Sequence, residues 1–330
     1  MGREFFHLLK KDGRLMLSGK FFLLALGSLV LYSVYIHFVY VNVNQEIYPV
    51  YLYDPKGKQA ISTEYVTRVD TRERLEAACA DRYSVGVDLS LDEPELYMLS
   101  SGLDTADHYR AVWAWAALEK MADSQVQITG TDSREMKNRR EITAEFLFFE
   151  LSAVGFLGLA SMLFKEKQMG VIRVHAILPV SRAAFIFSKL FWILASDLTF
   201  AALLTVINLG FPGGLTVLPA VLVQTGILSL LMALIGFLCA IGLPDFRQFS
   251  LLYLVIAVFV TTPVFLAGQT GLSWGWLKYH PMYHLFMSMK SAYFGAPVKA
   301  ILYYLVCAGG IGLLFLLAHR ALTREMAKEG

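Results

Sequence analysis

Residues 165–190 read KEKQMGVIRVHAILPVSRAAFIFSKL, a stretch that is basic, half hydrophobic and broken once by Pro179. It lies between two apolar stretches that are long enough to cross a bilayer, since a membrane-spanning helix needs about 20 mostly apolar residues. The part before Pro179 fits a short helix that ends there, and Ser181 can cap the helix that follows. One side of the short helix carries Val171, Val174 and Leu178. The sequence therefore predicts a short amphipathic helix, held at both ends by membrane spans and able to contact a soluble partner.

The whole chain has the composition of a membrane protein. Of its 330 residues, 56% are hydrophobic and 17% are charged, and the mean hydropathy is +0.52. The net charge of +2 is too small to indicate nucleic acid as a partner. Cys79, Cys239 and Cys307 have no metal-ligand spacing, so we expect them to be packing residues.

Six segments are apolar enough to span a bilayer. They are residues 21–43, 145–164, 184–209, 217–241, 250–268 and 299–319. The first is too long for a cleavable signal and no cleavage site follows it, so we expect it to remain as an anchor. The predicted fold class is an all-α membrane protein with six transmembrane helices, the last four of them within residues 184–319.

The basic residues of the short flanking segments predict how these spans are oriented. Lys and Arg are frequent in residues 1–20, 165–183 and 320–330. The short loops of the other side hold only Lys278, Lys290 and Lys299. By the positive-inside rule, both termini and the 165–183 segment are cytoplasmic. Because residues 1–20 mix apolar and basic side chains, we expect them to form a helix in the inner membrane interface, with 320–330 as a cytoplasmic tail.

Residues 44–144 form the one long polar segment, between the first two spans. Their pattern predicts strands at 48–54, 65–70, 83–90 and 95–100, and helices at 71–82 and 107–122. Thr71 is the expected N-cap of the first of these helices. The segment is therefore predicted to be a small α+β extracellular domain. Its acidic residues lack the spacing of a calcium loop and indicate a solvated face.

The sequence contains no catalytic motif: GxxxxGK[ST], GxSxG, HExxH and CxxC are all missing. We therefore expect no enzyme activity, and energy for any transport must come from an ion gradient or a partner. An ion-coupled carrier needs ionisable groups within its spans, and the candidates are Asp197, Glu150 and His37. His280 and His284 are four residues apart but lack a third ligand, so no metal site is predicted.

The 165–190 stretch resembles the membrane subunits of ABC-2-type ABC transporters, the ATP-binding cassette exporters. The positions that carry the resemblance are Glu166, Gly170, Val171 to Leu178, Pro179, Val180, Ser181, Arg182, Phe185, Ser188 and Lys189. Six spans with a large outer domain between the first two also fit that family, and the outer segment 270–297 resembles its re-entrant hairpin. Family members often have a second acid beside the first and a Thr after the glycine. Here those positions hold Lys167, Gln168 and Val171, so the detail of the partner contact differs.

The resemblance implies a permease that works with other chains. Two such subunits would pair as a homo- or heterodimer in the cell membrane, each docking a cytoplasmic ATPase that binds ATP and Mg, while this chain itself binds no cofactor. The implied ATPase-docking set is Glu166, Gly170, Val171, Arg173, Val174, His175, Leu178, Pro179 and Arg182. The candidate substrate path, between the two copies, holds Tyr32, Tyr35, Glu150, Asp197 and Asn208. The cargo implied by analogy is a small amphiphile or drug.

Two other functions remain open from the sequence. The chain could be an ion-coupled secondary transporter, for which Asp197 is the leading candidate residue, although no hydropathic symmetry relates its halves. It could also be a membrane sensor or assembly subunit whose 44–144 domain binds a ligand and whose short helix signals to a cytoplasmic partner.

Overall fold

The computed structural model describes residues 2–19, 21–40, 49–57, 66–80, 84–91, 93–100, 104–118, 126–130, 134–177, 181–270 and 275–329. The chain divides into two compact units. The helical unit comprises Met1–Tyr32, Thr143–Leu204 and Val217–Gly330. The sheet unit comprises Ser33–Ile142 and Thr205–Thr216.

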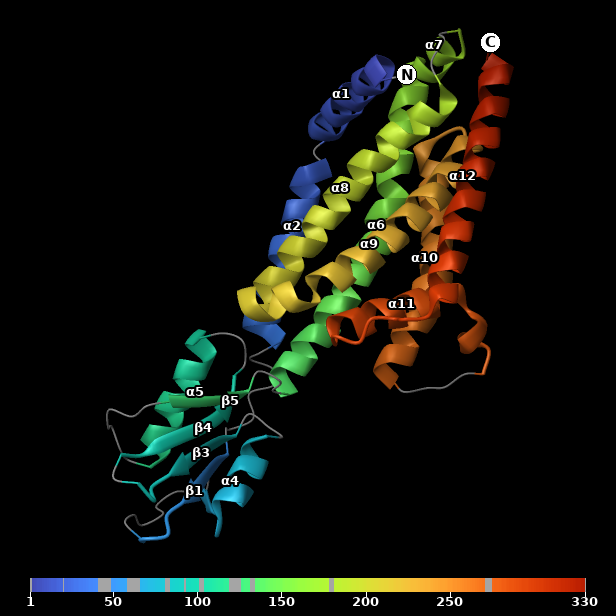
Figure 1. Cartoon of the computed structure of the whole chain (residues 1–330). Helices are drawn as coiled ribbons and strands as arrows, with labels where there is room; N and C mark the ends of the chain where they lie inside the picture. The colour runs from blue at the N-terminus through green and yellow to red at the C-terminus, as the bar shows by residue number, and fades with distance from the viewer. Residues whose placement is uncertain are drawn as a thin grey trace. The chain divides into compact units, whose positions relative to one another are not determined.

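Long helices make up most of the helical unit. In chain order the helices that contribute to it are α1 (Gly2–Ser18), α2 (Phe21–Val34), α6 (Arg134–Gln168), α7 (Val171–Ile177), α8 (Arg182–Leu209), α9 (Phe211–Ile241), α10 (Phe246–Thr270), α11 (Pro281–Tyr293) and α12 (Ile301–Glu329). A π-helical turn, Tyr35–Tyr40, continues α2 into the sheet unit. α7 lies at the end of the helical unit that also carries α1 and the last turns of α12 (Figure 1).

The helices long and apolar enough to cross a membrane confirm a multi-pass membrane protein. By length and composition four of them qualify among the described residues: Met136–Gln168, Arg182–Leu209, Phe211–Ile241 and Ile301–Ala327. A fifth span results if α1 and α2, bent by 56° at their junction, are taken as one. α10 is apolar over the shorter stretch Phe246–Val258. The described helices thus give four or five spans, and the predicted count of six stays a prediction.

The helices also extend beyond several predicted spans. α6 begins at Arg134, before the predicted start at 145, and α9 begins at Phe211 rather than 217. The predicted hairpin 270–297 contains a short 3₁₀ turn, Leu277–Tyr279, followed by α11, while its residues 271–274 lie outside the described part. α11 is anchored by its buried apolar side and by Phe286, whose ring centroid is 5.2 Å from that of Phe148 in α6.

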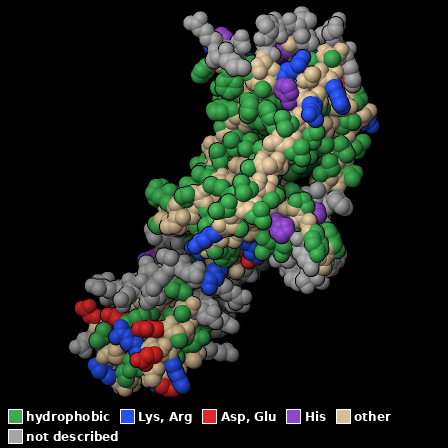
Figure 2. Space-filling view, turned by 45° about the vertical axis from the view of Figure 1, so that its right-hand side comes forward, with side chains coloured by type: hydrophobic (Ala, Val, Ile, Leu, Met, Phe, Trp, Pro, Cys, Tyr) green, Lys and Arg blue, Asp and Glu red, His purple; other side chains and the backbone are tan. Residues whose placement is uncertain are grey.

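Apolar side chains cover the exposed surface of the helical unit. On α12, Ile301, Leu302 and Val306 are each at least 65% exposed, and α10 exposes Leu254 and Val255 in the same way. Figure 2 shows that hydrophobic side chains dominate the drawn face of this unit, with Lys and Arg gathered near the end that holds α7 and His side chains at both ends. An apolar surface this large is expected of helices that contact lipid.

The sheet unit is built on a five-stranded sheet of order β2-β1-β3-β4-β5. The strands are β1 (Val50–Tyr53), β2 (Val66–Arg68), β3 (Val85–Asp88), β4 (Glu95–Leu99) and β5 (Val126–Gly130). β1 is parallel to β2 and β3, β4 is antiparallel to β3, and β5 is parallel to β4. The first four strands and both helices lie where the sequence predicts them, whereas β5 was not predicted.

Two helices cover opposite faces of this sheet. α4 (Arg72–Cys79) packs Leu75 and Cys79 against Tyr97, whereas α5 (Asp104–Ala117) packs Trp115 against the other core cluster, which holds Leu96 and Met98. Because successive side chains of a strand point to opposite faces, neighbouring residues of β4 belong to different clusters. The predicted N-cap is confirmed: Thr71 Oγ1 accepts a hydrogen bond from the Arg74 amide at 3.3 Å.

Leu75 holds α4 on the sheet, so Leu75→Ala should loosen it. The side chain is 0% exposed, and truncating a buried leucine costs about 2–5 kcal/mol. We expect hydrogen–deuterium exchange of the full-length protein to show reduced amide protection in β3, the strand that α4 covers. Leu91→Ala is the matched control, because Leu91 is 46% exposed. Equal loss of protection in both variants would contradict the assigned packing.

Candidate functional site

The last turn of α6 is tied to three other helices by consecutive residues. Lys165 Nζ donates to Ser18 Oγ at the end of α1, at 3.2 Å. Glu166 Oε2 lies 2.9 Å from Lys189 Nζ of α8. Lys167 Nζ donates to main-chain carbonyls at the end of α9, with 2.7 Å to Ile241 and 2.9 Å to Leu243, where unpaired carbonyls favour a cation. The sequence KEK thus fixes the point from which the chain enters α7.

Glu166 belongs to a charge cluster, which we define as Lys11, Asp12, Glu166, Ser188 and Lys189 and in which Lys11 alone is partly exposed. Lys189 Nζ lies 3.1 Å from Asp12 Oδ1 and 3.0 Å from Glu166 Oε1, so one ammonium bridges two carboxylates. Lys11 Nζ also donates to Glu166, and Ser188 Oγ donates to Asp12. The side chains of Asp12, Glu166 and Lys189 are 0% exposed. The cluster therefore joins α1, α6 and α8 through charge-assisted bonds.

Aromatic contacts surround this cluster. Lys189 Nζ lies 3.9 Å from the centre of the Phe185 ring, which adds a cation–π attraction. Trp192 Nε1 donates to the Leu9 carbonyl of α1 at 2.8 Å. A Cβ on Gly13 would come within 2.6 Å of the Trp192 ring, so only glycine allows α1 this close to α8. The glycine that interrupts the apolar pattern of α1 is therefore a contact residue.

α7 is a short helix set off from α6 by a sharp turn at Gly170. Gly170 has a φ of +69° and no atom near its absent Cβ, so the left-handed backbone rather than close packing requires glycine here. Beyond this turn, Ile172 is 1% exposed and α7 packs against α12. Val174, on another side of the helix, is 50% exposed. α7 thus has one face held by the protein and another open to a partner.

His175 lies on the inner side of α7, between the exposed helix surface and the charge cluster. Its ring centroid is 5.2 Å from that of Phe185, and its Nδ1 lies 3.1 Å from the Val171 carbonyl. Burial lowers the pKa of His175, and the nearby Lys11 and Lys189 ammonium groups lower it further. The neutral ring is therefore the favoured form at pH 7.

The docking residues expected from the sequence fall into different environments. Met169, which was not among them, is exposed, as are Val174 and Arg182, while Gly170, Val171 and His175 are partly exposed. Glu166 is buried in the charge cluster. Arg173 lies on α7 without a described side chain, and Leu178 and Pro179 lie outside the described residues.

The polar residues expected along a substrate path do not form one group. Glu150 accepts hydrogen bonds from Ser28 at 2.7 Å and from Tyr32 at 2.8 Å, joining α6 to α2. Asp197 instead accepts from Ser229 of α9 at 2.6 Å. Tyr35 and Asn208 belong to the sheet unit, where Asn208 is buried and Tyr35 is 39% exposed. Within the helical unit, Tyr32 and Glu150 are joined by a hydrogen bond, whereas Asp197 bonds to Ser229.

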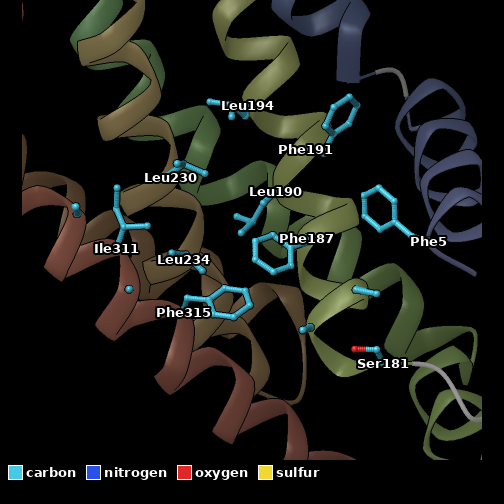
Figure 3. A pocket seen from close by; sticks show the side chains of 14 residues that line it. Phe5, Ser181, Phe187, Leu190, Phe191, Leu194, Leu230, Leu234, Ile311 and Phe315 are labelled. Atoms are coloured by element: carbon cyan, nitrogen blue, oxygen red, sulfur yellow. The ribbon is translucent and has the colours of Figure 1, made fainter. Parts of the chain in front are cut away.

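An apolar cavity of about 950 Å³ opens among α1, α8, α9 and α12. Figure 3 shows Phe187 of α8 next to Phe315 of α12, and their ring centroids are 4.6 Å apart. Phe191 of α8, Leu234 of α9 and Phe5 of α1 line the cavity around this pair. Ser181 is the one hydroxyl among the described residues of its lining. The cavity can hold an apolar group but offers few hydrogen-bond partners. Among the described residues, no group of three His, Cys, Asp or Glu could hold a metal ion.

Sequence reasoning missed the charge cluster, although α1 carries a signal of it. Leu8, Asp12 and Met16 are spaced four apart and share one face of α1, and all three are buried. An acid in the middle of an apolar helix face requires a buried cation. The sequence does not tell which cation, because Lys189 is 177 residues away.

Comparison with known proteins identifies a family. The family described as ABC-2 family transporter protein matches residues 96–319, more than half of the chain. Neither the curated proteins nor the solved structures give a match.

Removal of the bridging cation should destabilise the helical unit. Lys189→Met removes the cation that pairs with both Asp12 and Glu166 and leaves these carboxylates buried. Breaking a buried ion pair lowers the free energy of unfolding by about 3–5 kcal/mol. We expect a clearly lower thermal unfolding midpoint of the purified protein in detergent. The matched control is Lys299→Met at an exposed position, which should change the midpoint little. Similar midpoints for both variants would contradict the role of the cluster.

The stability contributed by neutral His175 should depend on pH. Because its pKa in the folded protein lies below the 6.5 of the unfolded chain, this contribution is complete above pH 6.5 and is lost as the pH falls below that value. His175→Gln should therefore lose less thermal stability than the wild type between pH 6.5 and 5.5. His7→Gln, at an exposed position, should retain the wild-type slope. An unchanged slope in His175→Gln would refute the assignment of a neutral ring.

Proposed function

We propose, because this chain belongs to the ABC-2 transporter family, that it is the transmembrane permease subunit of an ABC exporter. It is a multi-pass membrane protein, and members of this family are transport subunits rather than enzymes. The proposal adds that a separate ATPase docks on α7, hydrolyses ATP and drives export, and that two permease subunits pair. It also places six spans in the cell membrane with both termini in the cytoplasm.

The observation that supports ATPase docking most directly is the mechanical setting of α7. The helix exposes Val174, follows the fixed turn at Gly170, and begins directly after the three tethers of Lys165, Glu166 and Lys167. A force that the ATPase applies to α7 would pass directly into α6. From there the three tethers would transmit it to α1, α8 and α9. Coupling of a soluble motor to membrane helices needs such a connection, because each state must be favoured by different contacts.

Within this proposal, the docking residues have two roles. Val171, Val174, His175 and Arg182 would contact the ATPase, because their side chains are at least partly exposed. Glu166 would act from inside the chain by holding the end of α6 to Lys189. Arg173, Leu178 and Pro179 stay in the proposed set by resemblance to the family.

The apolar cavity supports an amphiphilic cargo. Its lining of aromatic and aliphatic side chains suits the apolar part of a small molecule, and its volume of about 950 Å³ is within the range of drug-sized sites. The hydrogen-bonded pair Tyr32 and Glu150 would meet the polar part of such a cargo along the path.

The orientation proposed here is supported by charge. The end of the helical unit near α7 carries Lys10, Arg14, Lys165, Arg320 and Arg324. Positive residues in short segments remain on the cytoplasmic side. The sheet unit, which includes most of the long polar segment, would then be extracellular.

A charge on the exposed side of α7 should uncouple the ATPase. Val174→Asp places a carboxylate in the proposed contact, and loss of one central contact typically weakens binding by about 2 kcal/mol, or roughly thirtyfold. We expect loss of co-purification with a cognate phosphate-loop ATPase, and loss of transport-coupled ATP hydrolysis.

Val112→Asp is the matched control for this test. Val112 is 45% exposed, close to the value for Val174, but it lies on α5 of the sheet unit. It should retain ATPase binding. Full binding and full ATP hydrolysis with Val174→Asp would refute docking on α7. Transport by the purified chain alone that depends on Asp197 would instead support an ion-coupled carrier.

A further inference from the structure

A second cavity, of about 560 Å³, lies between α1 and the end of α6 and is strongly basic. His7, Lys10, Lys11 and Arg14 of α1 line it together with Lys165 of α6. We call this cavity the basic pocket. It is distinct from the apolar cavity, because no residue lines both.

Most of the positive charge in the basic pocket is uncompensated. Lys11 is paired with Glu166 of the charge cluster. Among the described residues, Lys165 donates only to the Ser18 hydroxyl, which is neutral. Lys10 and Arg14 are exposed and form no ion pair within the described part of the chain. Three cations that converge on one concave site without a carboxylate favour an anionic ligand, and phosphate is the anion that Lys and Arg bind best.

Apolar side chains beside the pocket indicate that the anion carries a hydrocarbon part. Met169 and Leu15 belong to the lining itself. Met169 is 53% exposed, and on α1 Leu17 is 66% exposed and Phe6 is 69% exposed. A free phosphate would gain nothing from these side chains, whereas a lipid would bury them against its acyl chains.

From these features we infer that the basic pocket binds the headgroup phosphate of an anionic phospholipid. The inference rests on the proposed orientation, in which α1 lies at the inner membrane surface. Basic clusters immediately next to a membrane span on the cytoplasmic side attract anionic lipid headgroups.

Lys11 connects this lipid site to the charge cluster. Its ammonium lines the basic pocket and also donates to Glu166, the acid that anchors the end of α6. A headgroup phosphate in the pocket competes with Glu166 for Lys11. Lipid binding therefore weakens the Lys11–Glu166 ion pair, which holds the end of α6 from which α7 begins.

Titration of the full-length purified protein with dioleoylphosphatidylglycerol and dioleoylphosphatidylcholine, followed by native mass spectrometry, tests the site. The wild type should prefer the anionic lipid. Lys10→Ser together with Arg14→Ser should weaken binding of the anionic lipid by roughly twentyfold and leave the zwitterionic lipid unaffected. Neither partner chain nor nucleotide is needed, so failure of the export proposal and failure of this site are separate results.

Arg320→Ser together with Arg324→Ser is the matched control. It removes the same charge from exposed positions of α12, at the same end of the helical unit, and should keep the wild-type preference. An equal loss in this control would show a general effect of surface charge and overturn the site. Displacement of the lipid by millimolar inorganic phosphate would assign the pocket to free phosphate and also overturn it. If the double variant unfolds, Lys10→Glu alone provides the same comparison.

Discussion

The helical unit depends on one ammonium group shared between two carboxylates. Lys189 bridges Asp12 and Glu166 out of contact with solvent, and Lys11 brings the cluster to two positive and two negative charges. Buried ions repay their desolvation only when every charge is matched and hydrogen-bonded. The main effect of the cluster is therefore to fix the relative positions of α1, α6 and α8 rather than to add stability. Only one arrangement of these helices pairs all four charged side chains at once.

This geometry determines what α7 can do. A seven-residue helix has little stability of its own, so its position comes from its neighbours. On one side, backbone hydrogen bonds from Met169 to Lys165 and from Gly170 to Lys167 close the left-handed turn, and the contact with α12 holds the helix body. Lys167 extends the same support to α9 through the carbonyls that end that helix. α7 is thus held at its start and along its body by contacts with other helices of the same unit.

The sequence predicts most helices and the first four strands, because those depend on local patterns. A membrane span satisfies its own backbone hydrogen bonds, so apolar length is enough to locate it. β5 was missed because its pairing with β4 is non-local and its five residues follow a polar stretch. At the site, the turn at Gly170 and the exposure of Val174 follow from local sequence. The burial of Glu166 does not, since its partners Lys11 and Lys189 are 155 and 23 residues away.

Asp12 decides how α1 is held. An amphipathic helix that is bound by lipid alone has a continuous apolar face, because a carboxylate among acyl chains is costly. α1 instead places Asp12 between Leu8 and Met16 on its buried face, and Gly13 brings the helix against Trp192. Away from α8, that carboxylate would keep only Lys11 of α1, at 3.5 Å, and would lose its hydrogen bonds with Lys189 and Ser188. The apolar face of α1 therefore packs specifically against α8, and its opposite, basic face is available to the membrane surface.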